Sequence, residues 1–458
     1  MVQIPQLRYA RNPISIGGAV VTTVSAALFL VVFLLELFGF HTNPYIGIVV
    51  FLILPGGFLG GLAVMPIGVW YERRRQISGR APSKPKWPSL DLNDPRVRRV
   101  TLFLAVMSFI NVVIVSLAAY RGIEYMDSVP FCGQVCHEVM QPEFTAYQDG
   151  PHSRVTCVQC HIGPGAPWFV RSKLSGVRQV FAVMANSFSR PIPSPVENLR
   201  PARDTCEQCH WPEKFHGDLV RVVREFTEDE ANTESTTALQ LHVGGGGEIE
   251  PSGVGIHWHV NPDNRVEYVA TDDKRQEIPW VRFTDAQGNV RDYFADGVTE
   301  ADLAGRERRV MDCVDCHNRP THPFAASAAR AVDEAIASGL VTATLPYIKR
   351  EAVAALTESH ESREAAVDAI AARLQSFYER EYPQLLTGQR AALDRAIRAT
   401  QNLYRRNVFP SMNIGWGTYV NNIGHMDFPG CFRCHNDEHK TRDGVIIGQD
   451  CSTCHTFQ

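Results

Sequence analysis

Three long apolar stretches occupy most of the first quarter of the chain, and a more polar remainder follows them. They run over residues 14–38, 45–70 and 101–120. A transmembrane α-helix needs about 20 consecutive apolar residues, so each stretch is long enough to cross a bilayer. The first is too long for the apolar core of a signal peptide, and it lacks a convincing cleavage site. We therefore predict a transmembrane anchor of three helices over residues 1–125.

The basic residues between these stretches indicate how the anchor is oriented. Segment 71–100 carries nine arginine and lysine residues, whereas the short turn at residues 41–44 carries no formal charge. Positively charged loops of membrane proteins stay in the cytoplasm. We therefore expect segment 71–100 and the N-terminus to be cytoplasmic, and everything after the third helix to be extracytoplasmic.

Small residues mark the second apolar stretch. Gly56, Gly57, Gly60 and Gly61 follow Pro55 and form two overlapping GxxxG pairs. Glycines at this spacing let helices approach each other closely in lipid. Helix packing is the favoured interpretation, and a groove for a lipid or quinone is the alternative.

Alternating apolar and polar residues predict a small β insertion at about residues 240–300. Strand-like segments occur at residues 266–270, 278–283 and 290–294, after a polar stretch at residues 227–235. A turn containing Gln287 and Gly288 separates the last two segments, as is typical of a hairpin.

A second insertion, at about residues 325–407, has the periodicity of helices. It is rich in alanine, and apolar residues recur at helical spacing, for instance Ala365, Ile370, Leu374 and Phe377. We predict three or four helices here, with a scaffold or partner-docking role.

Twelve cysteines form six pairs, each followed at once by a histidine, and no cysteine is left over. In a CxxCH motif the thiols form thioethers with haem and the histidine ligates the iron from one face. The first motif has one residue more between its cysteines than the other five. The motifs are Cys132, Cys136 and His137; Cys157, Cys160 and His161; Cys206, Cys209 and His210; Cys313, Cys316 and His317; Cys431, Cys434 and His435; and Cys451, Cys454 and His455.

Paired cysteines also occur in disulfides and zinc sites, but neither requires a histidine after every second cysteine. We therefore predict six c-type haems. The net charge of −4 indicates no particular partner, and the basic residues at 71–100 serve topology, so nucleic-acid binding is not expected.

The haem motifs agree with the predicted orientation, because covalent haem attachment is completed outside the bacterial cytoplasmic membrane. We expect the chain in the bacterial inner membrane with its haem domain in the periplasm. There are too few residues per motif for each haem to have its own domain. The predicted fold class is mainly α: the transmembrane anchor joined to a multihaem cytochrome c domain, residues 126–458, whose helices and irregular segments surround the haems.

Histidines outside the motifs are candidates for the second axial ligand of each iron. Bis-histidine ligation gives lower potentials than histidine–methionine ligation, which suits a chain of low-potential electron carriers. His257 and His259 flank Trp258 and would point to opposite faces of an extended segment, so we expect only one of them to ligate. The other candidates are His152, His322, His425, His439 and His242.

The region around the first two motifs resembles the NapC/NirT family of membrane-anchored, quinol-oxidising cytochromes. The resemblance is carried by FCGQVCHEVMQPEFTAYQDGPHSRVTCVQCH, residues 131–161, directly after a transmembrane stretch. The stretch CVQCHIGPGAPWFVRSKLSGVRQV and the downstream RPARDTCEQCHWPEKF look more like the inner-membrane multihaem cytochromes of metal-reducing and related bacteria.

This resemblance implies that menaquinol or ubiquinol is oxidised at the haem nearest the membrane, and that electrons pass to a periplasmic or outer-surface redox protein such as a cytochrome c. The family's first motif reads CxxCHxM, with the methionine as a possible axial ligand. Here Met140 stands three residues after His137 instead of two, so either residue is a candidate ligand of the first iron.

Quinol oxidation also releases protons, so its site needs groups that accept them. Glu124, Asp127 and Glu138 surround the first motif and are the candidate acceptors. Two other functions remain open: a terminal reductase with one open haem, and a wiring subunit of a larger respiratory complex whose partner oxidises the quinol.

Overall fold

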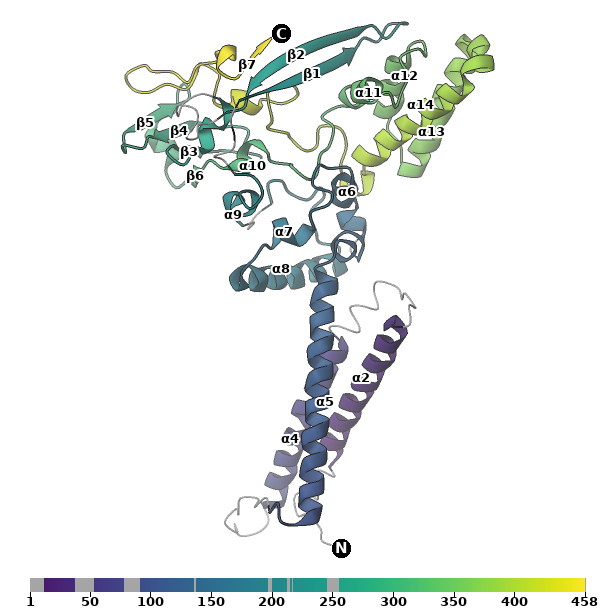
Figure 1. Ribbon diagram of the computed structural model, residues 1–458, viewed down its shortest axis with the longest axis vertical. Coiled ribbons are helices and arrows are strands. Elements are labelled where there is room, and N and C mark those ends of the chain that lie inside the picture. The colour runs from purple at the N-terminus through teal and green to yellow at the C-terminus, as the bar shows by residue number, and fades with distance from the viewer. Residues whose placement is uncertain are drawn as a thin grey trace. The chain divides into compact units, whose positions relative to one another are not determined.

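The computed structural model describes residues 12–37, 53–77, 91–135, 137–196, 200–211, 215, 217–244 and 255–457 (Figure 1). The chain forms two compact units, Met1–Cys136 and His137–Gln458. The first is helical, and the second combines short helices, two small sheets and a group of longer helices. The predicted fold class, mainly α with small β elements, is confirmed.

Three helices of the first unit are long and apolar enough to cross a membrane, as predicted. They are α2 (Pro13–Leu37), α4 (Leu54–Ile77) and α5 (Pro95–Met126). Helix α5 extends beyond the apolar stretch at both ends. It begins early because Asp94 caps it, accepting a hydrogen bond from the Arg96 amide at 2.8 Å. The predicted start of the second span, residues 45–52, lies outside the described residues.

Two of the four glycines predicted to mediate helix packing lie between α2 and α4. A Cβ atom on Gly57 would stand 2.7 Å from Ser25 Oγ, and one on Gly61 would stand 2.6 Å from the carbonyl oxygen of Gly18. Cβ atoms on Gly56 and Gly60 would meet nothing within 4 Å. Close helix packing therefore depends on one GxxxG pair, Gly57 and Gly61.

The second unit begins with short helices near the motifs. They are α6 (His137–Gln148), α7 (Cys157–His161), α8 (Ala166–Met184), α9 (Ala202–Cys206) and α10 (Cys313–Cys316). Short 3₁₀ segments are η4 (Ile256–Val260), η5 (Glu300–Leu303), η6 (Pro383–Leu385), η7 (Pro410–Met412), η8 (Gly430–Arg433) and η9 (Cys451–Thr453).

Two antiparallel sheets lie in this unit, with strand orders β5-β4-β3-β6 and β1-β2-β7. The three predicted strands correspond to β3, β4 and β5. The other sheet was not predicted: residues 227–233 connect a long hairpin whose register pairs Phe226 with Glu234. The strands are β1 (Asp218–Phe226), β2 (Glu234–His242), β3 (Arg265–Val269), β4 (Trp280–Thr284), β5 (Val290–Phe294), β6 (Arg309–Val310) and β7 (His455–Phe457).

Four helices form a group with a common apolar core (Figure 1). They are α11 (Ala328–Ala337), α12 (Ile348–Thr357), α13 (Arg363–Glu381) and α14 (Leu386–Asn407). Ile370, Leu374 and Phe377 are buried in this core as the periodicity predicted. Ala365 is exposed, and Ala366 takes the buried position four residues before Ile370.

Candidate functional site

The regularly spaced motifs lie on single turns of helix. The second, third and fourth motifs coincide with α7, the end of α9 and α10, and the fifth and sixth with η8 and η9. Every described cysteine is free, and the described residues contain no cluster of three or more metal-ligating side chains. Free thiols on a turn, with a histidine directly after them, fit covalent haem attachment better than a disulfide or a zinc site.

The irregular first motif begins in a π-helical turn, Phe131–Val135, directly after α5. A π-turn holds one more residue than an α-turn, so this motif begins in a wider turn than those of the other motifs. Cys132 lies in this turn, and Met140 lies on α6, which begins at His137. Cys136 and the side chains of His137 and Glu138 lie outside the described residues, so the choice between Met140 and His137 as ligand stays a prediction.

Each of the other five motif histidines faces a histidine from elsewhere in the chain. The ring centroids of the five pairs are 5.8 to 6.4 Å apart. The pairs are His161 with His322, His210 with His152, His317 with His257, His435 with His259, and His455 with His425.

This spacing fits a metal ion between two imidazole rings. A metal–imidazole bond is about 2 Å long, and the ring centre lies roughly 1 Å beyond the nitrogen, so rings on opposite faces of one metal have centroids about 6 Å apart. The residues present therefore fit five haem irons, each held between a motif histidine and a second histidine.

Hydrogen bonds fix the orientation of several of these rings. Five rings place Nδ1 2.6 to 3.2 Å from a main-chain carbonyl oxygen. An N–H at Nδ1 that donates to a carbonyl leaves the Nε2 lone pair available for a metal, as is usual for ligating histidines. These rings are His152, His257, His259, His322 and His435.

The protonation state of the buried rings is also suitable. Burial is the main cause that lowers the pKa of His161, His259, His317 and His322. A neighbouring histidine adds to the lowering for three of them, whereas Arg319 does so for His322. A lower pKa keeps the imidazole neutral near pH 7, and only the neutral ring has a lone pair for a metal.

The structure corrects two expectations about the ligands. His257 and His259 lie on the 3₁₀ turn η4 and not on an extended segment, so both face motif histidines. His439 is fully buried, with Nδ1 bonded to Asn436 at 3.0 Å and Nε2 to the Ile278 carbonyl at 2.7 Å, which leaves no ring nitrogen for iron. His242 places Nδ1 2.9 Å from an Asp218 carboxylate oxygen, a contact that ligating histidines also make, so its role as a ligand stays a prediction.

Consecutive motifs lie next to one another. Helix α9 of the third motif contacts α7 of the second and α10 of the fourth. The side chains of Cys206 and Cys313 also lie close enough to interact, which places the third and fourth motifs side by side. His257 and His259, two residues apart on η4, face the fourth and fifth motif histidines, so these two motifs must also be neighbours.

The fifth and sixth motifs are connected through an aromatic stack. Phe432, inside the fifth motif, stacks on His425 with a centroid distance of 4.0 Å. His425 in turn faces His455 of the sixth motif. The second to sixth motifs therefore follow one another in space in the order of the sequence.

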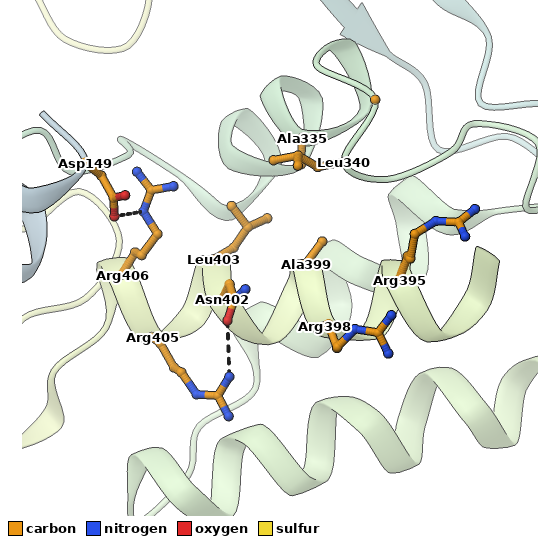
Figure 2. Close-up of a pocket in the computed structure, with 11 residues that line it drawn as sticks. Asp149, Ala335, Leu340, Arg395, Arg398, Ala399, Asn402, Leu403, Arg405 and Arg406 are labelled. Atoms are coloured by element: carbon orange, nitrogen blue, oxygen red, sulfur yellow. Dashed lines mark hydrogen bonds and ion pairs between the residues drawn. The ribbon is translucent and has the colours of Figure 1, made fainter. Parts of the chain in front are cut away.

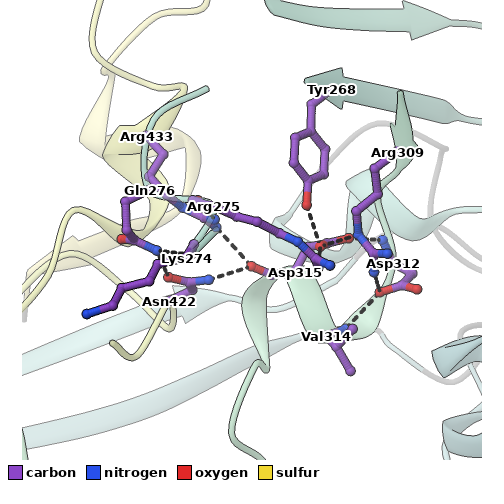
Figure 3. Close-up of polar contacts among 10 residues, drawn as sticks. All are labelled: Tyr268, Lys274, Arg275, Gln276, Arg309, Asp312, Val314, Asp315, Asn422 and Arg433. Atoms are coloured by element: carbon purple, nitrogen blue, oxygen red, sulfur yellow. Dashed lines mark hydrogen bonds and ion pairs between the residues drawn. The ribbon is translucent and has the colours of Figure 1, made fainter. Parts of the chain in front are cut away.

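A buried polar network lies between the fourth and fifth motifs (Figure 3). Asp315, inside the fourth motif, accepts hydrogen bonds from the Tyr268 hydroxyl at 2.6 Å and Arg309 Nε at 2.8 Å. Arg433, inside the fifth motif, donates from Nη2 to the main-chain carbonyl of Asp315 at 2.8 Å. The variable residues of the two motifs therefore hold them together.

The candidate proton acceptors lie at the end of α5. Glu124 forms an exposed ion pair with Arg121 at 2.6 Å. Asp127 follows the last residue of α5, and its amide donates to the Ile123 carbonyl at 2.9 Å. Both are next to the first motif along the chain, and Glu138 is on its other side.

A pocket in the helical group lies outside the motifs (Figure 2). Its lining is rich in arginine from α14, and Arg406 pairs there with Asp149 at 2.8 Å. None of its lining residues belongs to a motif or to a histidine pair.

Comparison with known proteins agrees with the geometry. The model of the NapC/NirT cytochrome c family, N-terminal region, matches residues 94–192. The cytochrome c-type protein ImcH of Geobacter sulfurreducens is 44% identical over 449 residues, which are 98% of this chain and 88% of that relative. No solved structure matches the chain.

Proposed function

The chain belongs to the NapC/NirT cytochrome c family, and from this premise we propose that it oxidises a quinol and passes the electrons to a redox protein outside the cytoplasm. Membrane anchoring and electron transfer follow from the family and the three apolar helices. The six haems, the quinol and the acceptor are our proposal. The observation that carries it is the set of five histidine pairs, each with one motif histidine.

The proposal assigns ten histidines as axial ligands and twelve cysteines as attachment sites. Bound haem iron cycles between its ferric and ferrous forms and so carries one electron at a time. The chain's own contribution is to fill both axial positions of five irons with imidazole. Filled positions leave no site for a small substrate, which argues against a terminal reductase at the second to sixth motifs.

The proposal also gives the relay a direction. Because the second to sixth motifs lie next to one another in sequence order, electrons that enter at the first motif leave at the sixth. Cys451, Ser452 and Thr453 of the sixth motif are exposed, as a site that meets a partner requires.

At the quinol end, Glu124, Asp127 and Glu138 would receive the protons. Glu124 is held by Arg121 but remains accessible to water, so a proton accepted there can be released to solvent. Placement of these groups in the periplasm of a bacterium follows from the basic segment 71–100.

A stopped-flow experiment tests the proposal. The full-length oxidised protein in detergent is mixed with a menaquinol analogue, with and without a quinone-site inhibitor, and haem absorbance is followed. We expect rapid reduction that the inhibitor blocks. If dithionite reduces the haems but the quinol analogue does not, quinol oxidation is excluded for this chain, and a partner subunit must oxidise the quinol.

A variant locates the proton acceptors. A double change, Glu124→Gln with Asp127→Asn, should slow reduction by quinol by about 100-fold, because a positioned base contributes about that much or more. The matched control is Glu379→Gln on α13, an exposed carboxylate in the helical group. Equal rates for both variants would contradict the assignment.

A further inference from the structure

Arg433 is a buried cation that pairs with no carboxylate among the residues that the structure describes. Its side chain lies within the fifth motif, between Cys431 and Cys434, and only 9% of the residue is exposed. Nε donates to the Gly430 carbonyl at 2.8 Å, Nη1 to the Arg275 carbonyl at 2.9 Å and Nη2 to the Asp315 carbonyl at 2.8 Å. All three acceptors are main-chain oxygens.

The surrounding charges do not neutralise it (Figure 3). The carboxylate of Asp315 is shared by Arg309, with Nε at 2.8 Å, and Arg275, with Nη1 at 3.3 Å. Asp312 pairs with Arg309 at 3.2 Å. Among the described side chains of this cluster, three arginines stand beside two carboxylates, so these side chains together carry one positive charge in excess.

This charge lies beside two attachment sites at once. Hydrogen bonds to the carbonyl between Cys313 and Cys316 place the guanidinium against the fourth motif, while its own backbone belongs to the fifth.

A fixed cation favours the reduced state of a neighbouring redox centre, because reduction lowers the positive charge that the cation repels. The interaction is strong in a buried site, where the effective dielectric constant is low, and local charge is one of the main determinants of haem potential. An arginine stays charged at any pH at which the protein folds, so its effect is permanent.

We propose that Arg433 raises the reduction potentials of the fourth and fifth haems together, and so makes this pair the place in the relay where electrons reside longest. The proposal rests on haem attachment at these motifs but not on quinol oxidation. It assigns Arg433 as a positioning residue whose charge acts on both sites through space, and not only through the hydrogen bonds that hold the motifs together.

Redox titration of three full-length variants, followed by haem absorbance, tests this. Arg433→Gln should lower the midpoint potentials of two haems and leave the others unchanged. Arg433→Lys keeps the charge but cannot reproduce the three-way hydrogen bonding, so both potentials should stay near those of the wild type. The matched control, Arg224→Gln, removes an exposed arginine paired with Glu234 and should change no potential, because water screens it.

The outcomes separate charge from structure. Equal shifts in Arg433→Gln and Arg433→Lys would show a structural effect and overturn the proposal, as would unchanged potentials in Arg433→Gln. If the Arg433→Gln variant does not fold with its haems, Arg275→Gln is the alternative test. It removes a half-buried cation of the same cluster and should lower the same two midpoint potentials. Unchanged potentials in Arg275→Gln would also overturn the proposal.

Replacement of the second axial ligands shows which measured potentials belong to the fourth and fifth haems. His257→Met and His259→Met should each raise one potential, because methionine ligation raises it. The two potentials that respond to these changes should be those that Arg433→Gln lowers. A wild-type protein that binds haem but is not reduced by quinol would disprove the proposed function and leave this test intact.

Discussion

Individual histidines differ in what their ring nitrogens contact, and this separates candidate ligands from structural residues. His322 donates from Nδ1 to the Glu143 carbonyl at 2.9 Å, and its ring centroid lies 6.2 Å from that of His161. His439 has both nitrogens occupied by protein groups. Both lie within five residues of a motif histidine, so their different surroundings, and not their sequence positions, decide their roles.

Replacement of His322 should open one axial position. In His322→Ala the second haem loses its second ligand, so a high-spin ferric signal should appear in the EPR spectrum, which the wild type lacks for this haem. His439→Gln is the matched control and should add no high-spin signal to that of the wild type. A high-spin signal in the control only would reverse the assignment of these two residues.

Sequence alone is most informative at the residue scale where the chemistry is local. A CxxCH motif contains its attachment groups and first ligand within five residues, so composition and spacing were sufficient to propose them. The second ligands come from distant segments. Nearness to a motif selected His152, His322 and His425, each of which faces a motif histidine, but it also selected His439. The expectation that only one of His257 and His259 ligates came from assuming an extended segment, where the structure has a 3₁₀ turn.

At the scale of elements, small residues decide how the anchor helices pack. Ser15 Oγ donates to the Met65 carbonyl at 2.9 Å, so a hydrogen bond joins α2 to α4 near the glycine contact. Glycine at position 61 allows this approach because any side chain there would overlap the backbone of α2.

Isoleucine at two neighbouring glycines should therefore have opposite outcomes. Gly61→Ile should weaken the α2–α4 contact by about 1 to 3 kcal/mol through overpacking, seen as lower thermal stability of the protein in detergent. Gly60→Ile adds the same volume where no atom lies within 4 Å, so its stability should equal that of the wild type. Equal losses of thermal stability in the two variants would mean that the Gly61 contact does not hold α2 and α4 together.

A buried ion pair joins helices α11 and α12, and its carboxylate also holds the end of the long hairpin. Lys349 Nζ pairs with Asp333, and Asp333 also accepts a hydrogen bond from the amide of Phe226 at the end of β1, at 2.9 Å. Both charged side chains are almost fully buried.

Removal of one charge of this ion pair should lower the free energy of unfolding more than removal of both charges. Lys349→Met leaves a buried carboxylate unpaired and should destabilise the protein by about 3 to 5 kcal/mol. The double variant Lys349→Met with Asp333→Asn should recover much of that loss, because neither charge remains buried. Urea unfolding followed by circular dichroism measures both, and additive losses would contradict this account.

The elements themselves were predicted to different degrees. The membrane helices, β3 to β5 and the four-helix group followed from hydrophobic periodicity. The hairpin β1–β2 did not, because most residues of β1 are exposed, so the strand lacks the alternation that marks a half-buried one. Its partner β7 is a three-residue strand at the far end of the chain.

For the whole molecule, the proposed function requires opposite sides of the membrane for the basic segment and the haem domain. The basic segment 71–100 and the positive-inside rule support this arrangement. The attachment chemistry supports it independently.

Limited proteolysis tests this topology. In inside-out membrane vesicles trypsin should cut within residues 71–100, which contain nine basic residues, and leave the haem-containing fragment intact. In right-side-out vesicles the same segment should be protected. Cleavage of the segment from the periplasmic side would overturn the topology and the periplasmic placement of the acceptor.

The pairing of histidines also bears on how such a protein is made. Export through the membrane proceeds from the N-terminus, and His152, His257, His259 and His425 each precede the motif that they face. Among the five described pairs, only that of the second motif uses a later residue, His322. Under the proposed ligation, sites three to six can mature as soon as their motifs emerge, whereas site two stays incomplete until the chain beyond the fourth motif has been translocated.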